Sequence, residues 1–188
     1  DPPLHPAALP ERFARHGSGG RPRVVLVLGG GGMKGFSHIG VLRGLERMGL
    51  QVDEVIGTSM GALIGSLFAA GLDSYQIEEL CEQVNIKDYF KLQLMKFLVR
   101  GYRHPSVYKG KVFRALLEEM LPIRRFDELA VPFFCNALSI TNGTTVYFGL
   151  DGAPEVPLVD AVYASCALPG IFEPMAIGDD HFIDGGMV

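Results

Sequence analysis

The chain has 188 residues, of which 48% are hydrophobic and 20% are charged, and its formal net charge at pH 7 is −4. This length and composition allow one domain with a sizeable core, and we expect no second domain. The three cysteines cannot all pair and lie in no CxxC motif, which excludes a disulfide framework and a structural zinc and favours a reducing compartment. The longest apolar stretch, residues 62–72, is too short to cross a membrane, so we expect a cytoplasmic or peripheral protein.

The two ends of the chain shape the expected domain organisation. Residues 1–22 carry Pro, Gly and Ser with little apolar periodicity, which predicts a flexible tail before a single domain at residues 23–188. The chain starts with Asp1 and stops at Val188, so we interpret it as a fragment that is truncated at its C-terminus.

The first elements follow a strand, turn and helix pattern. Residues 24–28 form a continuous aliphatic run, as expected of a strand that is covered on both faces in a parallel sheet. Residues 34–48 have helical spacing, and Gly49 is a C-terminal stop. A short strand at residues 54–56, a sharp turn and an apolar helix through Ala70 repeat the pattern. We therefore predict an α/β fold with a mainly parallel sheet. The apolar stripe of the first helix is Ile39, Leu42, Leu45 and Met48.

The rest of the chain continues with helices and strands. Asp73 or Ser74 can cap a helix that runs to about Val84. Asn142-Gly143 is the strongest hairpin signal in the chain and joins two runs with strand character. A last short strand delivers Asp184. The expected ranges are residues 109–121 and 158–164 for further helices, and residues 131–140, 144–148 and 182–183 for strands.

The sequence Gly57-Thr58-Ser59-Met60-Gly61 is a G-x-S-x-G motif between a predicted strand and a predicted helix. A nucleophilic serine needs its hydroxyl exposed on a tight turn, and flanking glycines let neighbouring backbone approach without a Cβ clash. The N–H groups at the start of the following helix favour a developing negative charge at the same place. The motif predicts a nucleophile elbow with Ser59 as nucleophile. A chance match in a chain with 24 glycines is the alternative.

A second glycine-rich segment, Gly29-Gly30-Gly31-Gly32-Met33-Lys34-Gly35, follows the first predicted strand. It fits G-x-G-x-x-G, and Asp53 and Glu54 lie near the spacing of a ribose-binding acid, so a nucleotide-binding module is an alternative. A phosphate-binding P-loop fits less well, because a glycine follows the lysine of this segment where Ser or Thr should stand. The serine elbow at the next strand favours an oxyanion hole instead. The residues expected to form it are Gly30, Gly31 and Gly32.

The order of the polar residues does not fit an ordinary α/β-hydrolase, in which a histidine follows the catalytic acid. The last histidine, His181, precedes Asp184. We therefore expect a Ser–Asp dyad, unless a histidine such as His38 serves by an unusual route. A free Asp has a pKa of about 3.9 and is a weak base for serine unless burial raises that pKa. His38 is more simply a packing residue of the first helix.

In series, the motifs resemble those of the patatin-like phospholipase family, in particular its bacterial and neuropathy-target-esterase-like branch. They occur in the family's order and span nearly the whole chain outside the tail. The matching segments are residues 30–35, 37–42, 57–61, 164–170 and 184–186. The glycines of these motifs are Gly30, Gly32, Gly35, Gly57, Gly61, Gly185 and Gly186.

The resemblance implies a three-layer α/β/α fold, a catalytic dyad of Ser59 and Asp184, and an oxyanion hole in the first glycine loop. It also implies hydrolysis of phospholipid or lysophospholipid esters through an acyl-enzyme, without a metal or another cofactor and without a nucleic-acid partner. One departure is Gly29, where plant patatins carry Asp. A second is the end of the chain at Val188, before the segment that usually follows the last motif. An acyltransferase on the same fold is the main alternative, and it should need a histidine base.

A basic segment is a candidate for membrane contact. Residues 81–114 hold eight Lys and Arg side chains against two acidic ones, a net charge of +6. Such a segment attracts anionic head groups, or it is ordinary solvated surface. Within it, residues 86–103 combine apolar and basic side chains, which predicts a lipid-contacting segment beside the site. Leu92, Met95 and Val99 fall outside the apolar face, so burial in the core or in a subunit contact is the alternative.

Overall fold

The computed structural model describes residues 21–86, 88–89, 92, 95, 107–149 and 155–187. Residues 1–20 of the predicted tail lie outside this set. So does most of the segment at residues 86–103 for which the sequence predicts lipid contact.

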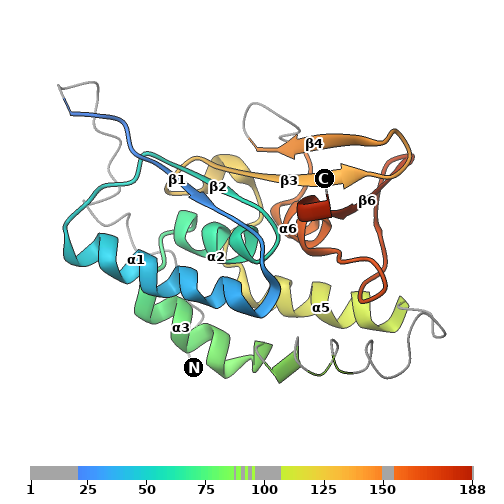
Figure 1. Ribbon diagram of the computed structural model, residues 1–188, viewed down its shortest axis with the longest axis horizontal. Coiled ribbons are helices and arrows are strands. Elements are labelled where there is room, and N and C mark those ends of the chain that lie inside the picture. Colours follow the sequence, from blue (N-terminus) through green and yellow to red (C-terminus); the bar gives the residue numbers. More distant parts are fainter. Residues whose placement is uncertain are drawn as a thin grey trace.

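Within the described residues, the chain forms a mixed six-stranded sheet with helices packed against one face (Figure 1). The predicted α/β class is confirmed, and of the three expected layers these residues supply the sheet and one helical layer. The strands are β1 (Val25–Leu28), β2 (Glu54–Gly57), β3 (Phe133–Ser139), β4 (Thr144–Phe148), β5 (Met175–Ile177) and β6 (Asp180–Asp184). The helices are α1 (Ser37–Arg47), α2 (Met60–Ala69), α3 (Ser74–Gln83), α5 (Val107–Met120) and α6 (Leu158–Cys166). Short 3-10 turns are η2 (Gly32–Phe36), η4 (Phe126–Glu128) and η5 (Gly185–Met187).

The order of the strands makes two strand ends meet. The order is β1-β2-β3-β6-β5, and β4 pairs with the other edge of β3. β1, β2 and β3 are parallel, whereas β4 and β6 run antiparallel to β3. Along one edge of β3, β2 ends with Gly57 opposite Cys135, and β6 ends with Asp184 opposite Ala137. The C-terminal ends of β2 and β6 therefore point toward each other, with Asn136 of β3 opposite the gap between them.

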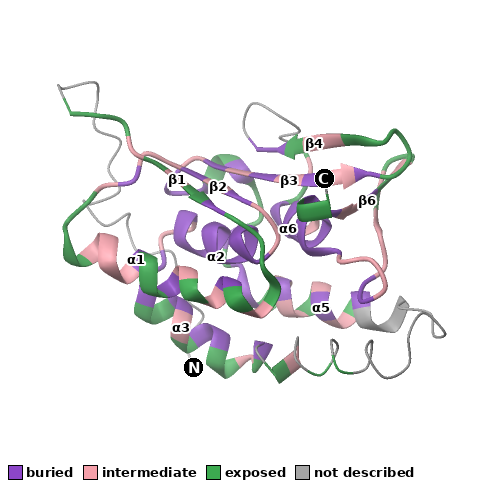
Figure 2. Cartoon of the chain, in the orientation of Figure 1, coloured by how far each residue is buried: buried purple, intermediate pink, exposed green. Residues whose placement is uncertain are grey.

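Helix α2 lies in the centre of the fold, and all of its residues are buried (Figure 2). It is apolar on nearly every side, as expected of a helix enclosed by a sheet and by other helices. The start of α2 packs closely against the sheet: a Cβ on Gly61 would lie 2.1 Å from the carbonyl oxygen of Leu28. A Cβ on Gly57 would likewise lie 2.5 Å from the Cα of Ala62. Both glycines of the elbow motif are thus required for this contact.

Two local signals of the sequence are confirmed. Asp73 caps α3, accepting hydrogen bonds from the N–H groups of Tyr75 and Gln76, while the Gln76 side chain accepts from the Asp73 N–H. This reciprocal capping box satisfies N–H groups that a helix start leaves unpaired. The hairpin between β3 and β4 turns at Asn142-Gly143, where Gly143 has a positive φ of 68°.

Other expectations are wrong. β1 is not covered on both faces: Val25 is 41% exposed and Val27 is 68% exposed, because β1 is an edge strand and only one of its faces packs against helices. Met48, which the sequence places on the apolar stripe of the first helix, is 68% exposed and lies just after the end of α1 at Arg47. Ile86, the first residue of the predicted lipid-contacting segment, is fully buried in the core.

Candidate active site

Ser59 occupies the sharp turn between β2 and α2. Its backbone angles are φ 53° and ψ −123°, in a region that residues other than glycine rarely adopt. Such a conformation costs about 1–3 kcal/mol and persists only where the surrounding structure holds it in place. The G-x-S-x-G motif therefore forms a strained strand-to-helix turn, with Ser59 at its sharpest point.

The end of α6 binds both backbone groups of Ser59. The Ser59 N–H donates to Ser165 Oγ over 2.9 Å, and the Cys166 thiol donates to the Ser59 carbonyl over 3.1 Å. Burial raises the pKa of the Cys166 thiol well above its ordinary value, and the charge of Asp184 acts in the same direction, so the sulfur keeps the proton that it donates. Two adjacent side chains thus stabilise the strained turn. The sequence motif contains both of them, but it assigns neither a role.

Asp184 lies next to Ser59. Ser59 Oγ donates to Asp184 Oδ2 over 2.6 Å, and the Gly186 N–H donates to Oδ1 over 2.8 Å. Asp184 is only 4% exposed. This burial raises the pKa of its carboxyl above the ordinary value, although the two hydrogen bonds that the carboxylate accepts act in the opposite direction. A raised pKa makes the carboxylate a stronger base toward a hydroxyl.

The same helix end also fixes the backbone of the acid. The Asp184 N–H donates to the carbonyl of Ala167 over 3.0 Å, directly after the two side chains that bind Ser59. The predicted pair is therefore brought together by three elements: β2 and β6 point their ends toward each other, and the end of α6 spans both.

The first glycine loop lies against Ser59. A Cβ on Gly30 would lie 3.3 Å from the Cβ of Ser59. Gly31 and Gly32 have φ angles of 145° and 55°, which side chains rarely allow. His38 Nε2–H donates to the carbonyl of Gly29 over 2.9 Å and so holds the start of the loop. The His38 ring is therefore engaged with the backbone of the loop.

The remaining motif glycines act through packing. A Cβ on Gly35 would lie 2.4 Å from the Cγ of Met60, and one on Gly185 would lie 2.3 Å from the carbonyl oxygen of Asn136. Neither glycine lines the cavity described below, and the same holds for Gly57 and Gly61. These positions require glycine because backbone or side-chain atoms occupy the space of a side chain.

Ser59 and Asp184 line one cavity of about 430 Å³. Its inner wall includes Phe172, which is 2% exposed and stacks on Phe113 with the ring centroids 4.7 Å apart. Its outer rim includes Met187, which is 48% exposed. The predicted residues brought together here are Ser59, Asp184, Gly30, Gly31, Gly32 and Gly186. The apolar lining consists of Met33, Met60, Leu168, Ile171, Phe172 and Met187.

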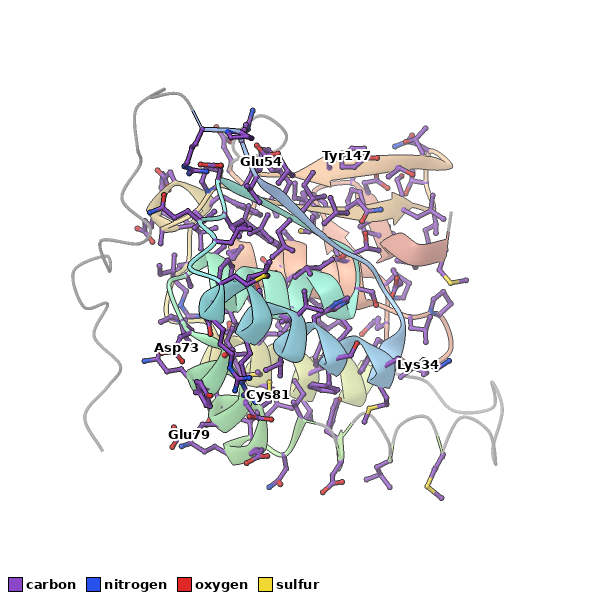
Figure 3. The ribbon with its side chains drawn as sticks, turned by 60° about the vertical axis from the view of Figure 1, so that its left-hand side comes forward. Lys34, Glu54, Asp73, Glu79, Cys81 and Tyr147 are labelled. Atoms are coloured by element: carbon purple, nitrogen blue, oxygen red, sulfur yellow. The ribbon has the colours of Figure 1, made fainter. Side chains whose placement is uncertain are left out.

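The acids that a nucleotide-binding module would need are engaged elsewhere. Asp53 binds the guanidinium of Arg21, which lowers the pKa of its carboxyl, and Glu54 pairs with Arg23. Both acids lie at the start of β2, and Figure 3 shows Glu54 at the opposite end of the strands from Lys34, which follows the glycine loop. At about 3.3 Å per residue, the four residues of β2 place Glu54 about 10 Å from the other end of this strand, which leads into the turn at Ser59.

Two further observations concern the residues that the structure describes. Among them, no group of three or more His, Cys, Asp or Glu side chains is arranged to hold a metal ion. None of their helices combines the length and the apolar character needed to span a bilayer.

Comparison with known sequences identifies relatives. Residues 26–188 match the family model described as patatin-like phospholipase. An uncharacterized NTE family protein of Mycobacterium tuberculosis is 30% identical over 168 residues, which are 89% of this chain and 43% of that protein. The lysophospholipase NTE1 of Candida albicans is 31% identical over 163 residues, which are 87% of this chain and 11% of that protein. The chain therefore spans less than half the length of these relatives.

Solved structures share the fold. VipD from Legionella pneumophila superposes with a TM-score of 0.62 at 18% identity, over 88% of this chain and 46% of that chain. ExoU in its complex with SpcU from Pseudomonas aeruginosa superposes with a TM-score of 0.58 at 17% identity, over 84% of this chain and 38% of that chain. These low identities show the fold alone. Because the family model covers all but the first 25 residues, the chain belongs to the patatin-like phospholipase family.

Proposed function

We propose that the chain is the catalytic domain of a serine lipid acyl hydrolase of the phospholipase A or lysophospholipase type. The observation that carries the proposal is the hydrogen bond of 2.6 Å from Ser59 Oγ to Asp184 Oδ2 in the wall of a largely apolar cavity. Family membership and the lysophospholipase name of the Candida albicans relative support a lipid ester as substrate.

The first half of the reaction forms an acyl-enzyme. Asp184 Oδ2 accepts the hydroxyl proton while Ser59 Oγ attacks the carbonyl carbon of the lipid ester. The resulting oxyanion is bound by N–H groups of Gly30, Gly31 and Gly32 and by the N-terminus of α2, where each good donor is worth roughly 3 kcal/mol. The ester C–O bond then breaks, and the leaving alcohol takes the proton from Asp184. The acyl group remains on Ser59.

The second half releases the fatty acid. Asp184 accepts a proton from water as the water oxygen attacks the acyl carbonyl, and the proton returns to Ser59 Oγ when the acyl–enzyme bond breaks. The apolar side chains that line the cavity suit an acyl chain; they include Leu168, Ile171, Phe172, Met33 and Met60. An acyltransferase that relies on a histidine base lacks support, because the His38 ring binds the Gly29 carbonyl and His181 is exposed on β6.

Fatty acid release from lysophosphatidylcholine tests the proposal. The wild-type protein should release fatty acid, and Ser59→Ala should abolish the release. Ser66→Ala is the control, because Ser66 is a buried serine of α2 whose hydroxyl donates only within its own helix, to the Leu63 carbonyl. Release by Ser59→Ala at the wild-type rate would refute the proposed function.

A further inference from the structure

We propose that Asn136 is a positioning residue that sets the separation of Ser59 and Asp184. The inference rests on the proposed function, because it concerns the geometry of the same pair. The side chain of Asn136 does not bond to either reacting oxygen. Its two hydrogen bonds are with the residues beside the pair.

The position of Asn136 in the sheet is special. On one edge of β3, Cys135 pairs with the last residue of β2, and Ala137 pairs with the last residue of β6. Asn136 lies between these two pairs, opposite the gap between the C-terminal ends of β2 and β6. The two strand ends that carry the nucleophile and the base therefore have no continuous ladder between them at this point.

The Asn136 side chain bridges this gap with two hydrogen bonds. Thr58 Oγ1 donates to Asn136 Oδ1 over 2.6 Å, and Asn136 Nδ2 donates to the carbonyl of Gly185 over 3.0 Å. Thr58 directly precedes Ser59, and Gly185 directly follows Asp184. One planar amide thus joins the two turns, and it uses its acceptor on one and its donor on the other.

Packing fixes the place of the amide. A Cβ on Gly185 would lie 2.7 Å from both Cγ and Oδ1 of Asn136, so the amide rests directly on the glycine backbone. The Thr58 methyl group lies 3.8 Å from the position of a Cβ on Gly186 and equally far from one on Gly30. The bridge is therefore enclosed by the same glycines that surround the proposed catalytic pair.

The bridge complements the contacts made by α6. Cys135 and Ala137 are buried toward the helices, whereas Asn136 is half-buried and, by the alternation of a strand, faces the other side of the sheet. Ser165 and Cys166 bind Ser59 from the helical side. The pair is held from both faces, so loss of the bridge should loosen the hydrogen bond between Ser59 and Asp184 without removing either group.

Thr58→Val tests this with little change of shape, because it removes the donated hydroxyl and keeps the side-chain volume. Hydrolysis of p-nitrophenyl butyrate should show a loss of about tenfold in kcat per active site, with KM changed by less than about twofold. Active sites are counted by fluorophosphonate titration. Thr58→Ser, which keeps the hydroxyl, should restore most of kcat. Thr145→Val is the matched control, because Thr145 is equally half-buried but lies on β4, opposite Leu138.

A second measurement separates positioning from general weakening of the fold. The rate of fluorophosphonate labelling should fall when Thr58→Val is added to the wild-type protein, and it should not fall further when Thr58→Val is added to Asp184→Asn, because the bridge acts through the alignment of Asp184. Equal fractional losses in both backgrounds would overturn the proposal, as would a wild-type kcat in Thr58→Val.

Asn136→Asp gives an independent test if Thr58→Val does not fold. The carboxylate keeps an acceptor for Thr58 but sets an oxygen against the Gly185 carbonyl, so kcat should fall by about tenfold or more. A wild-type kcat in this variant would overturn the proposal. Ser59→Ala is measured in the same series. Full hydrolysis by Ser59→Ala would refute the underlying function. An inactive Ser59→Ala beside fully active Thr58→Val and Asn136→Asp would refute the role of Asn136 alone.

Discussion

The contact between Ser165 and the turn at Ser59 leads to a quantitative prediction. Ser165 is fully buried, and its Oγ accepts the Ser59 N–H over 2.9 Å. Ser165→Ala removes this acceptor and leaves a small void that water does not readily enter. The Ser59 N–H then loses its partner, at a cost of about 1–3 kcal/mol for a buried polar group.

The lower part of that range is expected here, because Ser59 itself is half-buried and its N–H can regain some solvation. The turn also stores about 1–3 kcal/mol of backbone strain, which the lost bond helped to offset. We therefore expect the variant to lose about 1–2 kcal/mol of unfolding free energy. If the turn relaxes, the attack geometry deteriorates, and kcat should fall by about 5-fold to 30-fold.

The assay combines kcat per titrated active site on a soluble ester with thermal unfolding. Ser66→Ala is again the matched control, because Ser66 is equally buried and its hydroxyl bonds only within α2. We expect Ser66→Ala to keep wild-type kcat. Wild-type kcat in Ser165→Ala would show that α6 does not hold the nucleophile turn, and the reasoning from the strained backbone would be refuted.

Three further predictions address the pH dependence, the packing and the chemistry. Burial raises the pKa of Asp184, and the base must be ionised, so the acid limb of the kcat/KM–pH profile should lie above the ordinary Asp value of about 3.9; an inflection below that value would contradict the assignment. Because the folded-state pKa is raised, the stabilisation linked to this carboxyl is present below the unfolded pKa and is lost as the pH rises through the folded value. In chemical denaturation, Gly61→Ala should lower the unfolding free energy by at least about 1–3 kcal/mol, because its Cβ would lie 2.1 Å from the Leu28 carbonyl oxygen. Gly44→Ala is the control: it has open space around it on α1 and should be neutral or stabilising. Chelator treatment should leave the hydrolysis of a soluble ester unchanged, since the proposed mechanism uses no metal, and loss of activity that calcium or zinc restores would contradict it.

The sequence predicts those parts of the site that depend on local patterns. The turn at Ser59 could be expected because a strand, a G-x-S-x-G motif and a helix follow one another within a few residues. The lack of a histidine after the last motif favours a Ser–Asp dyad, and the resemblance of Asp184-Gly185-Gly186 to the family's last motif is what singles out Asp184. The cap at Asp73 and the hairpin at Asn142-Gly143 likewise depend on neighbouring residues only, and both are confirmed.

The missing parts depend on contacts between distant segments. Ser165 and Asn136 contact the nucleophile turn from 106 and 78 residues away, so no local periodicity reveals their partners. A polar residue in the middle of the apolar run Phe-Phe-Cys-Asn-Ala-Leu-Ser was the one available hint for Asn136. The exposure of Val27 was missed because a short aliphatic run looks the same whether one face or two faces are covered.

The central claim, that Ser59 is the nucleophile and Asp184 its base, is tested most directly by mapping the site of a fluorophosphonate adduct. The wild-type protein is labelled, digested and analysed by mass spectrometry, and the labelling rate is compared with that of Asp184→Asn. The account predicts an adduct on Ser59 alone and a labelling rate that falls by at least about a hundredfold in Asp184→Asn. An adduct on another serine, or a labelling rate in Asp184→Asn equal to that of the wild type, would contradict it.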